Sequence, residues 1–402
     1  MGLLAVSVVF FVLPGTRVRQ GIFLAASVGF VATQVPDPAG WVGLTAFLAA
    51  GFFVARALQR RPGRWLLVGY LVALLAAFVV LKQYAFAKAV LPAALFAHPI
   101  AIVGLSYLLF RQIHVAVDAF QGQIGVLTPG RYLAYQLNLF GITAGPIQRY
   151  PQFCEDWDRM EPVLVDGEAI LRAYRRVFLG VLKVSVFAAL CLAGHERLSA
   201  ALVVTGEGAI ASQAKTMLWF MGAFYLYPAY IYFNFSGYCD IVIAGASLLG
   251  VRMPENFDRP FIARNMIEYW TRWHRTLGFW IRDYLFTPLY RAIASRWPER
   301  AASMAFACYF VALFLTGIWH GSTWNFVIFG LLNGLGVAAA KLWENHLIAT
   351  RGRKGLKEYL ADKRIRVVAV VANFHFVCLT IFFFPSDLER SILLLRRLLG
   401  LA

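Results

Sequence analysis

Residues 313–326 read LFLTGIWHGSTWNF. This stretch ends one apolar run, 302–319, and begins another, 324–342. Each run approaches the roughly 20 residues that a helix needs to cross a bilayer. Lys and Arg gather in the polar segments that flank this pair, and basic loops are typical of the cytoplasmic face of a membrane. The sequence therefore predicts a helical hairpin whose turn, around His320, faces the other side or ends within the membrane.

The rest of the chain is similarly apolar. Of its 402 residues, 60% are hydrophobic and 15% are charged, whereas a soluble domain is nearer half apolar and a quarter charged. Further long apolar runs lie at 41–57, 65–81, 89–110, 174–193, 216–234 and 367–384, and shorter ones at 1–14, 21–35, 132–146 and 238–250. This pattern predicts an all-α polytopic membrane protein with about 10–12 transmembrane and re-entrant helices. No soluble domain stands out, so we expect a single membrane domain over residues 1–402.

The net charge of +17 comes from short loops between apolar runs. Membrane topology explains such loops better than nucleic-acid binding, for which basic residues would share one soluble face. We therefore expect a lipid bilayer, and no nucleic acid, among the partners. The sequence contains no HExxH motif, no nucleophile elbow and no phosphate-binding loop, so no metal or nucleotide site is expected.

Segment 251–300 is polar and basic yet rich in Trp and Tyr. If residues 265–284 of this segment form one helix, from Asn265 to Tyr284, then His274 lies on an aromatic face of that helix with Trp270 and Trp273. The opposite side of that helix carries the charged residues Arg272, Arg275, Arg282 and Asp283. Such a helix either lies at the membrane interface or folds back into the membrane against protein.

His274 and His320 are the two histidines whose surroundings suggest chemistry. An imidazole can take a proton from a hydroxyl at neutral pH, which would let that hydroxyl attack a thioester while nearby tryptophans exclude water. Two alternatives stay open. Either ring can be a neutral group held for packing, or both can be proton-relay groups of a non-enzymatic flippase or transporter.

Six groups of residues around these histidines match one known family. They are AGPIQR at 144–149, YFNFSGYCD at 232–240, MPENFDRPF at 253–261, WTRWH at 270–274, RDY at 282–284 and GIWHG at 317–321. In this order they resemble the motifs of the membrane-bound O-acyltransferase family, in its bacterial branch. His320 is similar to the family's essential intramembrane histidine, and His274 to the second histidine of this branch.

The resemblance implies helices that enclose a tunnel, with 251–300 as a re-entrant or interfacial segment. It also implies an O-acyltransferase of the bacterial inner (plasma) membrane. Members of this branch transfer D-alanyl groups to teichoic acid or acetyl groups to alginate, and the chain departs from both patterns. Residues 288–291 read PLYR instead of continuing as the Pro-Leu-Gly-Gly turn of the acetyl type, while Gln148 and Asn333 replace residues usual in the D-alanyl type. Both acyl groups therefore stay open.

The implied donor is a phosphopantetheine thioester on a cytoplasmic acyl carrier protein, with no cofactor bound to the chain itself. The implied acceptor is an extracytoplasmic cell-envelope polysaccharide or teichoic-acid-like polymer, or a periplasmic or extracellular partner transferase. Because carrier proteins are typically acidic and complementary charge steers encounter, Arg275 and Arg282 are expected on the donor side. The full set of expected substrate-binding residues is Trp273, Arg275, Arg282, Asp283, Trp319 and Asn325.

Overall fold

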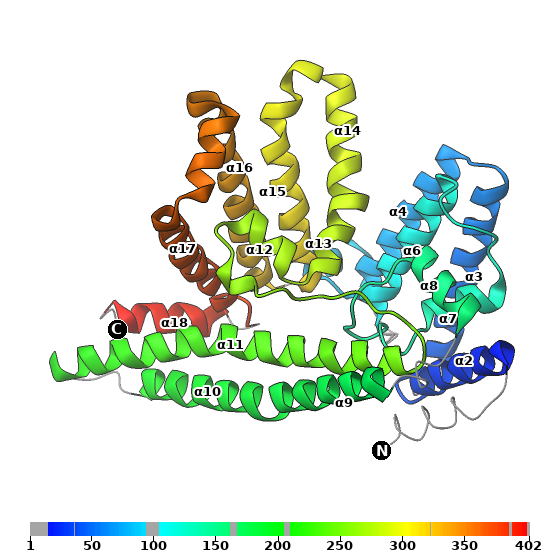
Figure 1. Ribbon diagram of the computed structural model, residues 1–402, viewed down its shortest axis with the longest axis horizontal. Helices are drawn as coiled ribbons and strands as arrows, with labels where there is room; N and C mark the ends of the chain where they lie inside the picture. Colours follow the sequence, from blue (N-terminus) through cyan, green and yellow to red (C-terminus); the bar gives the residue numbers. More distant parts are fainter. Residues whose placement is uncertain are drawn as a thin grey trace. The chain divides into compact units, whose positions relative to one another are not determined.

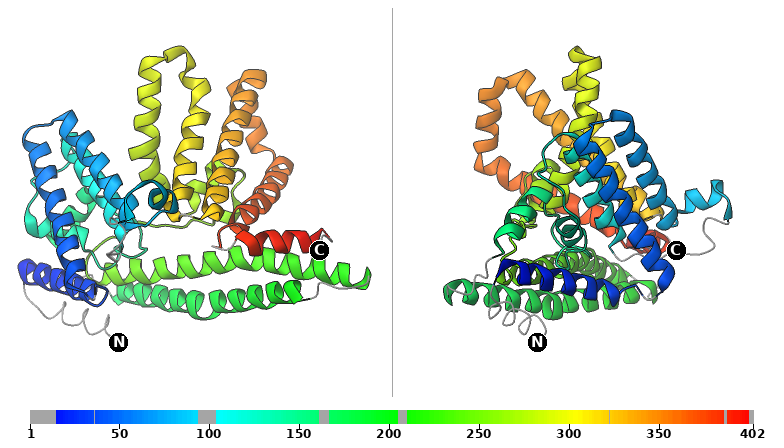
Figure 2. Two further views of the ribbon diagram at one scale, coloured as in Figure 1. Left: turned by 180° about the vertical axis from the view of Figure 1, so that it is seen from behind. Right: turned by 90° about the vertical axis from the view of Figure 1, so that its right-hand side faces the viewer.

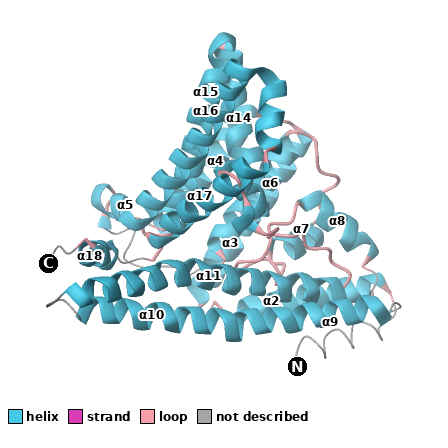
Figure 3. Ribbon diagram, turned by 60° about the vertical axis from the view of Figure 1, so that its left-hand side comes forward, coloured by secondary structure: helices cyan, strands magenta, loops and turns pink. Residues whose placement is uncertain are grey.

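The computed structural model describes residues 15–35, 37–93, 104–160, 167–204, 210–321, 323–385 and 388–399. Every regular element among these residues is a helix, and Figure 3 shows only loops and turns between them. The predicted all-α class is confirmed. The chain groups into two compact units, residues 1–179 with 238–255 and residues 180–237 with 256–402. Since one membrane domain can contain more than one compact unit, the single domain over residues 1–402 stays a prediction.

The first unit is built around α6 (Leu105–Phe120), most of whose residues are buried. Its other helices are α2 (Thr16–Ala32), α3 (Pro38–Arg60), α4 (Arg64–Leu81), α5 (Ala85–Val90), α7 (Pro129–Gln136), α8 (Tyr150–Arg159) and most of α9 (Gly167–Leu182). Helices α3, α4, α7 and α8 contact α6. The buried Arg111 of α6 donates hydrogen bonds to the backbone oxygens of Tyr135 (2.8 Å) and Gln136 (2.6 Å), because a buried charge requires polar partners.

The second unit holds both histidines of interest. Its elements are the π-helix η2 (Lys183–Ala188), α10 (Ala189–Val204), the first part of α11 (Ile210–Leu248), η3 (Pro260–Ile262), α12 (Met266–Arg272), α13 (Arg275–Ile281), η4 (Arg282–Phe286), α14 (Thr287–Arg296), η5 (Pro298–Arg300), α15 (Ala301–His320), α16 (Trp324–Ala361), α17 (Lys363–Phe382) and α18 (Leu388–Leu398). Figure 1 shows α15 beside α16, with the short α12 and α13 near their lower ends, and Figure 2 shows the yellow and orange helices from two further sides.

Five helices among the described residues are long and apolar enough to cross a membrane. They are Pro38–Arg60, Arg64–Leu81, Gly167–Val203, Trp324–Ala361 and Lys363–Phe382, and a shorter apolar helix covers Met304–His320. A multi-pass membrane architecture is thus confirmed. The predicted segment 1–14 and residues 94–103 of the predicted segment 89–110 lie outside the described residues, and the enclosed tunnel stays a prediction.

Helices α15 and α16 form the hairpin that the sequence predicts for 302–342, with His320 as the last residue of α15. Glycines allow the two helices to approach closely. A Cβ atom at Gly317 would collide with the backbone of Gly330, and one at Gly334 would lie 3.0 Å from the backbone oxygen of Phe310. Small residues of this kind let neighbouring membrane helices pack backbone against backbone, so they fix the position of His320 at the end of the pair.

Helix α16 is longer than the apolar run from which it was predicted. It continues to Ala361, through residues expected to form a polar loop. Its geometry is interrupted at Gly352, which has φ 67°, a conformation that glycine adopts without steric cost. The membrane hairpin therefore ends in a bent polar helix.

Candidate functional site

The segment from Asn265 to Tyr284 is not the single helix that its periodicity predicts. Helix α12 ends at Arg272 and α13 begins at Arg275. Between them, His274 has φ 42°, in the left-handed region where a helix of L-residues cannot continue. The prediction was wrong because a periodic pattern does not reveal one residue with this backbone conformation. The aromatic residues of the predicted face, Trp270 and Trp273, are nevertheless buried, as is His274.

Asn256 holds the break between the two helices. Its backbone oxygen accepts a hydrogen bond from the backbone N–H of Arg275 (3.0 Å). Its side-chain Oδ1 lies 3.1 Å from Nδ1 of His274 and accepts hydrogen bonds from the backbone N–H (3.2 Å) and the hydroxyl (2.9 Å) of Thr276. Asn256 is itself only 1% exposed. It belongs to the MPENFDRPF motif, yet the sequence analysis did not single it out.

Aromatic rings surround His274, which is 5% exposed. The ring of Phe235, from α11, meets the imidazole edge to face with 4.8 Å between centroids. Phe257 bridges Phe235 and Trp273, with centroid distances of 5.1 Å to each. Trp273 in turn stacks on Tyr269 at 5.7 Å. The expected role of Trp273 in excluding water is consistent with this apolar setting, and a direct contact with substrate stays a prediction.

His320 has a second aromatic setting at the hairpin tip. Its ring is half-buried and lies 4.7 Å from Trp319, 5.2 Å from Phe384 and 5.7 Å from Phe329, between centroids. Phe384 lies just after α17, so α15, α16 and the segment that follows α17 contribute to this setting. Asn325, the second residue of α16, is 1% exposed. The structure thus brings Trp319 to His320, while substrate contacts of Trp319 and Asn325 stay predictions.

The two histidines lie near each other within the second unit. Burial lowers the pKa of His274, and a charge on His320 lowers it further, which requires the two rings to be close. The His274 ring is therefore neutral near pH 7. A passage that both rings line, within the tunnel that the family resemblance implies, stays a prediction.

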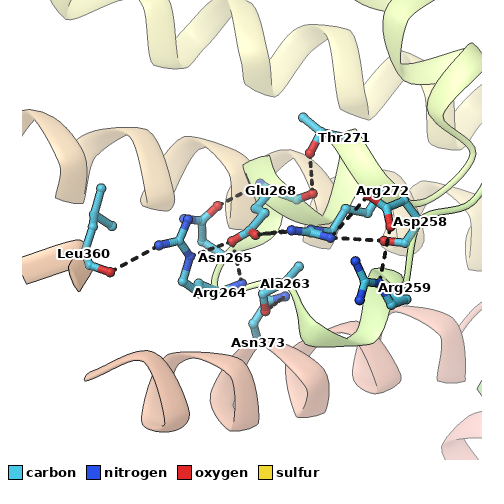
Figure 4. A network of polar contacts seen from close by, with 10 residues as sticks. All are labelled: Asp258, Arg259, Ala263, Arg264, Asn265, Glu268, Thr271, Arg272, Leu360 and Asn373. Carbon is cyan, nitrogen blue, oxygen red and sulfur yellow. Dashed lines mark hydrogen bonds and ion pairs between the residues drawn. The ribbon is translucent and has the colours of Figure 1, made fainter. Parts of the chain in front are cut away.

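A charged network fixes α12 to its surroundings, as Figure 4 shows. Glu268 accepts hydrogen bonds from the side chains of Arg264 (2.8 Å) and Arg272 (2.9 Å). Burial raises the pKa of Glu268, but these hydrogen bonds lower it more, so the net shift is downward and the carboxylate stays ionised. Arg264 also donates to the backbone oxygen of Leu360 (3.3 Å), which ties α12 to the far end of α16. The sequence analysis placed Arg272 in the WTRWH motif, but it did not pair this residue with Glu268.

Arg275 and Arg282 both lie close to one aromatic ring, that of Phe279. Their guanidinium carbons are 5.7 Å and 5.0 Å from the centroid of Phe279. Arg282 is exposed and forms an ion pair of 2.8 Å with Asp283, so Asp283 accompanies the basic pair. We call Arg275, Phe279 and Arg282 the basic patch.

An apolar cavity of about 130 Å³ adjoins the basic patch. Its walls include Trp270, Phe279, Arg282, Phe286, Tyr309 and Leu313. The cavity therefore runs between α12, α13 and η4 on one side and α15 on the other. Neither His274 nor His320 lines it. Across the described residues, His, Cys, Asp and Glu form no group of three that could hold a metal ion.

The chain is similar in sequence to several named proteins. A teichoic acid D-alanyltransferase of Streptococcus thermophilus is 28% identical over 292 residues, which is 71% of this chain and 69% of that protein. The corresponding protein of Bacillus subtilis is 26% identical over 289 residues, with the same shares of 71% and 69%. A probable alginate O-acetylase of Pseudomonas fluorescens is 28% identical over 347 residues, 82% of this chain but only 62% of that protein.

The match to a family model is broader than any single motif. Residues 45–382 match the model of the membrane-bound O-acyltransferase family. That range runs from within α3 to the end of α17, and thus includes both histidines, Asn256, the basic patch and most of the hairpin. The motif resemblance, the membrane helices and this match agree. The chain belongs to the membrane-bound O-acyltransferase family.

Proposed function

We propose that the protein transfers a D-alanyl or acetyl group from a cytoplasmic thioester to a hydroxyl of an extracytoplasmic cell-envelope polymer. The relatives named for teichoic acid D-alanyl transfer and for alginate O-acetylation support this substrate class. Both acyl groups remain in the proposal, because similar identities of 28% link the chain to each type. The proposed location is the bacterial inner membrane.

The observation that carries the proposal is that His274 and His320 each lie among aromatic rings, and a charge on His320 acts on the His274 ring. In the transfer, the hydroxyl oxygen of the acceptor forms a bond to the acyl carbonyl carbon and the thioester C–S bond breaks. The hydroxyl proton passes to an imidazole and then to the departing thiolate, so the products are an ester and a free thiol. One histidine accepts this proton while the other stabilises the charge that develops on the carbonyl oxygen. Aromatic walls keep out water, which would otherwise compete as the acceptor.

The donor in this proposal is a phosphopantetheine thioester on an acyl carrier protein. The exposed Arg282 and its neighbour Arg275 offer positive charge to an acidic carrier. The apolar cavity beside the basic patch is suited to the uncharged part of a flexible thioester arm. The acceptor is an envelope glycan or teichoic-acid-like polymer, reached directly or through a partner transferase outside the membrane.

Transfer in reconstituted vesicles tests the proposal. The purified protein is incubated with a carrier protein bearing labelled acetyl or D-alanyl thioester and with an acceptor glycan in the lumen. We expect the label on the glycan through an ester bond, which hydroxylamine cleaves. A His320→Ala variant in identical vesicles is the control. Label that crosses the membrane without any ester product would instead identify a transporter and would contradict the proposal.

A further inference from the structure

The side-chain oxygen of Asn256 has a single possible hydrogen-bonding role. It faces the backbone N–H of Thr276 at 3.2 Å, and a backbone N–H can only donate. The atom at this position is therefore the amide oxygen, because the amide nitrogen, also a donor, would face another donor. An amide oxygen can only accept, so Nδ1 of His274, 3.1 Å from it, must carry a hydrogen.

This geometry determines where the neutral His274 ring can react. A neutral imidazole carries one hydrogen, and here it is on Nδ1, so the lone pair is on Nε2. No hydrogen bond joins Nε2 to any residue that the structure describes. The backbone helps to keep the arrangement: His274 is in the left-handed conformation (φ 42°), and the N–H of Arg275 donates to the backbone oxygen of Asn256 (3.0 Å).

We propose that Asn256 is a positioning residue that holds the neutral His274 ring with its hydrogen on Nδ1, so that Nε2 is the atom that accepts the acceptor's hydroxyl proton. His320, close to this ring, then has the second role, stabilising the carbonyl oxygen or orienting the donor. In the transfer, Nε2 takes the hydroxyl proton as the C–O bond forms and returns it to the thiolate as the C–S bond breaks. The catalytic part of this inference rests on the proposed acyl transfer, whereas the position of the hydrogen does not.

Nitrogen NMR of protein with ¹⁵N-labelled histidine tests the hydrogen position directly. The His274 signals are assigned by their loss in His274→Gln. We expect a protonated Nδ1 and an unprotonated Nε2 in the wild type, and a change in this distribution in Asn256→Leu, which removes the acceptor. Thr276→Val is the matched control, because it removes a neighbouring hydroxyl but keeps the backbone N–H and Asn256, and it should leave the spectrum unchanged. A wild-type ring protonated on Nε2 would overturn the inference whether or not the protein transfers acyl groups.

Kinetics then test the catalytic role. Asn256→Leu should lower kcat on the order of 10- to 100-fold, the range for removing groups that orient metal-bound histidines, with little change in the KM for the donor. Asn256→Asp still accepts from Nδ1 and adds a negative charge, so it should retain the Nδ1 hydrogen and move the acid side of the kcat–pH profile to higher pH. If Asn256→Leu does not fold, the shift in the kcat–pH profile expected for Asn256→Asp tests the role instead. A wild-type kcat in Asn256→Leu, or an unshifted profile in Asn256→Asp, would contradict the role.

Discussion

At the scale of single residues, His274 and His320 differ in how their rings are held. His274 is almost fully buried and has a hydrogen-bond partner on Nδ1 that fixes its orientation. His320 is half-buried at a helix end and is bordered by the rings of Trp319, Phe329 and Phe384. A tightly held ring is suited to a fixed proton acceptor, whereas a ring at a hairpin tip can adjust to a bound substrate. A site that brings two substrates together needs both a fixed proton acceptor and a ring that can adjust to the bound substrate.

We expect His320→Ala to lower acyl transfer by about 100- to 1,000-fold, the usual contribution of one group that stabilises a developing oxyanion. The protein should still fold, because His320 is only half-buried and the hairpin is held by glycine contacts elsewhere. Product formation and thermal unfolding in detergent are measured together. His346→Ala, at an exposed histidine on α16, is the matched control and should retain activity. Near-normal turnover in His320→Ala would remove this residue from the mechanism.

Both histidines could be predicted as site residues from the sequence, but Asn256, which orients the His274 ring, could not. His274 and His320 stand in recognisable motifs and in aromatic surroundings. Asn256 lies 18 positions before His274, and their contact depends on the left-handed turn at His274. A backbone conformation of one residue has no periodic pattern, so the pairing could not be derived from the sequence. That Arg275 and Arg282 both lie close to the ring of Phe279 could likewise not be derived from the sequence.

At the scale of elements, the prediction succeeded for the hairpin and failed for the helix 265–284. Long apolar runs specify membrane helices because burying backbone groups in lipid requires a helix, so 302–319 and 324–342 could be read directly. The segment 265–284 is held by side-chain contacts with distant residues, such as Glu268 with Arg264 and Arg272. In this short segment, contacts of this kind determine where the helices end, against the periodic pattern of the sequence.

The close approach of α15 and α16 leads to a stability prediction. In Gly330→Ala, the new Cβ would lie 2.7 Å from the backbone oxygen of Phe314, so the helices must separate. We expect a loss of about 1–3 kcal/mol, as for other overpacked positions, seen as a lower melting temperature in detergent. Gly69→Ala is the control, since no atom lies within 4 Å of a Cβ there. Equal melting temperatures for the two variants would show that this contact does not limit stability.

At the scale of the whole molecule, the net charge of +17 reflects an excess of 38 Lys and Arg over 21 Asp and Glu. Membrane topology accounts for basic residues in loops, but it does not require two arginines on one aromatic ring beside a cavity. Arg275 and Arg282 have that arrangement. The basic patch is therefore the surface at which we propose that an acidic carrier binds.

If the basic patch receives the donor carrier, reversing its exposed charge should weaken donor use. We expect Arg282→Glu to raise the KM for the acyl carrier protein several-fold, with little change in kcat, because Arg282 lines a cavity that neither histidine lines. Salt screens exposed charges beyond roughly 10 Å at 0.1 M, so wild type and variant should converge as the salt concentration rises. Arg353→Glu, an equal reversal at another exposed arginine of α16, is the control. The same KM increase in both variants would indicate a nonspecific charge effect, and an unchanged KM in Arg282→Glu at low salt would place the carrier elsewhere.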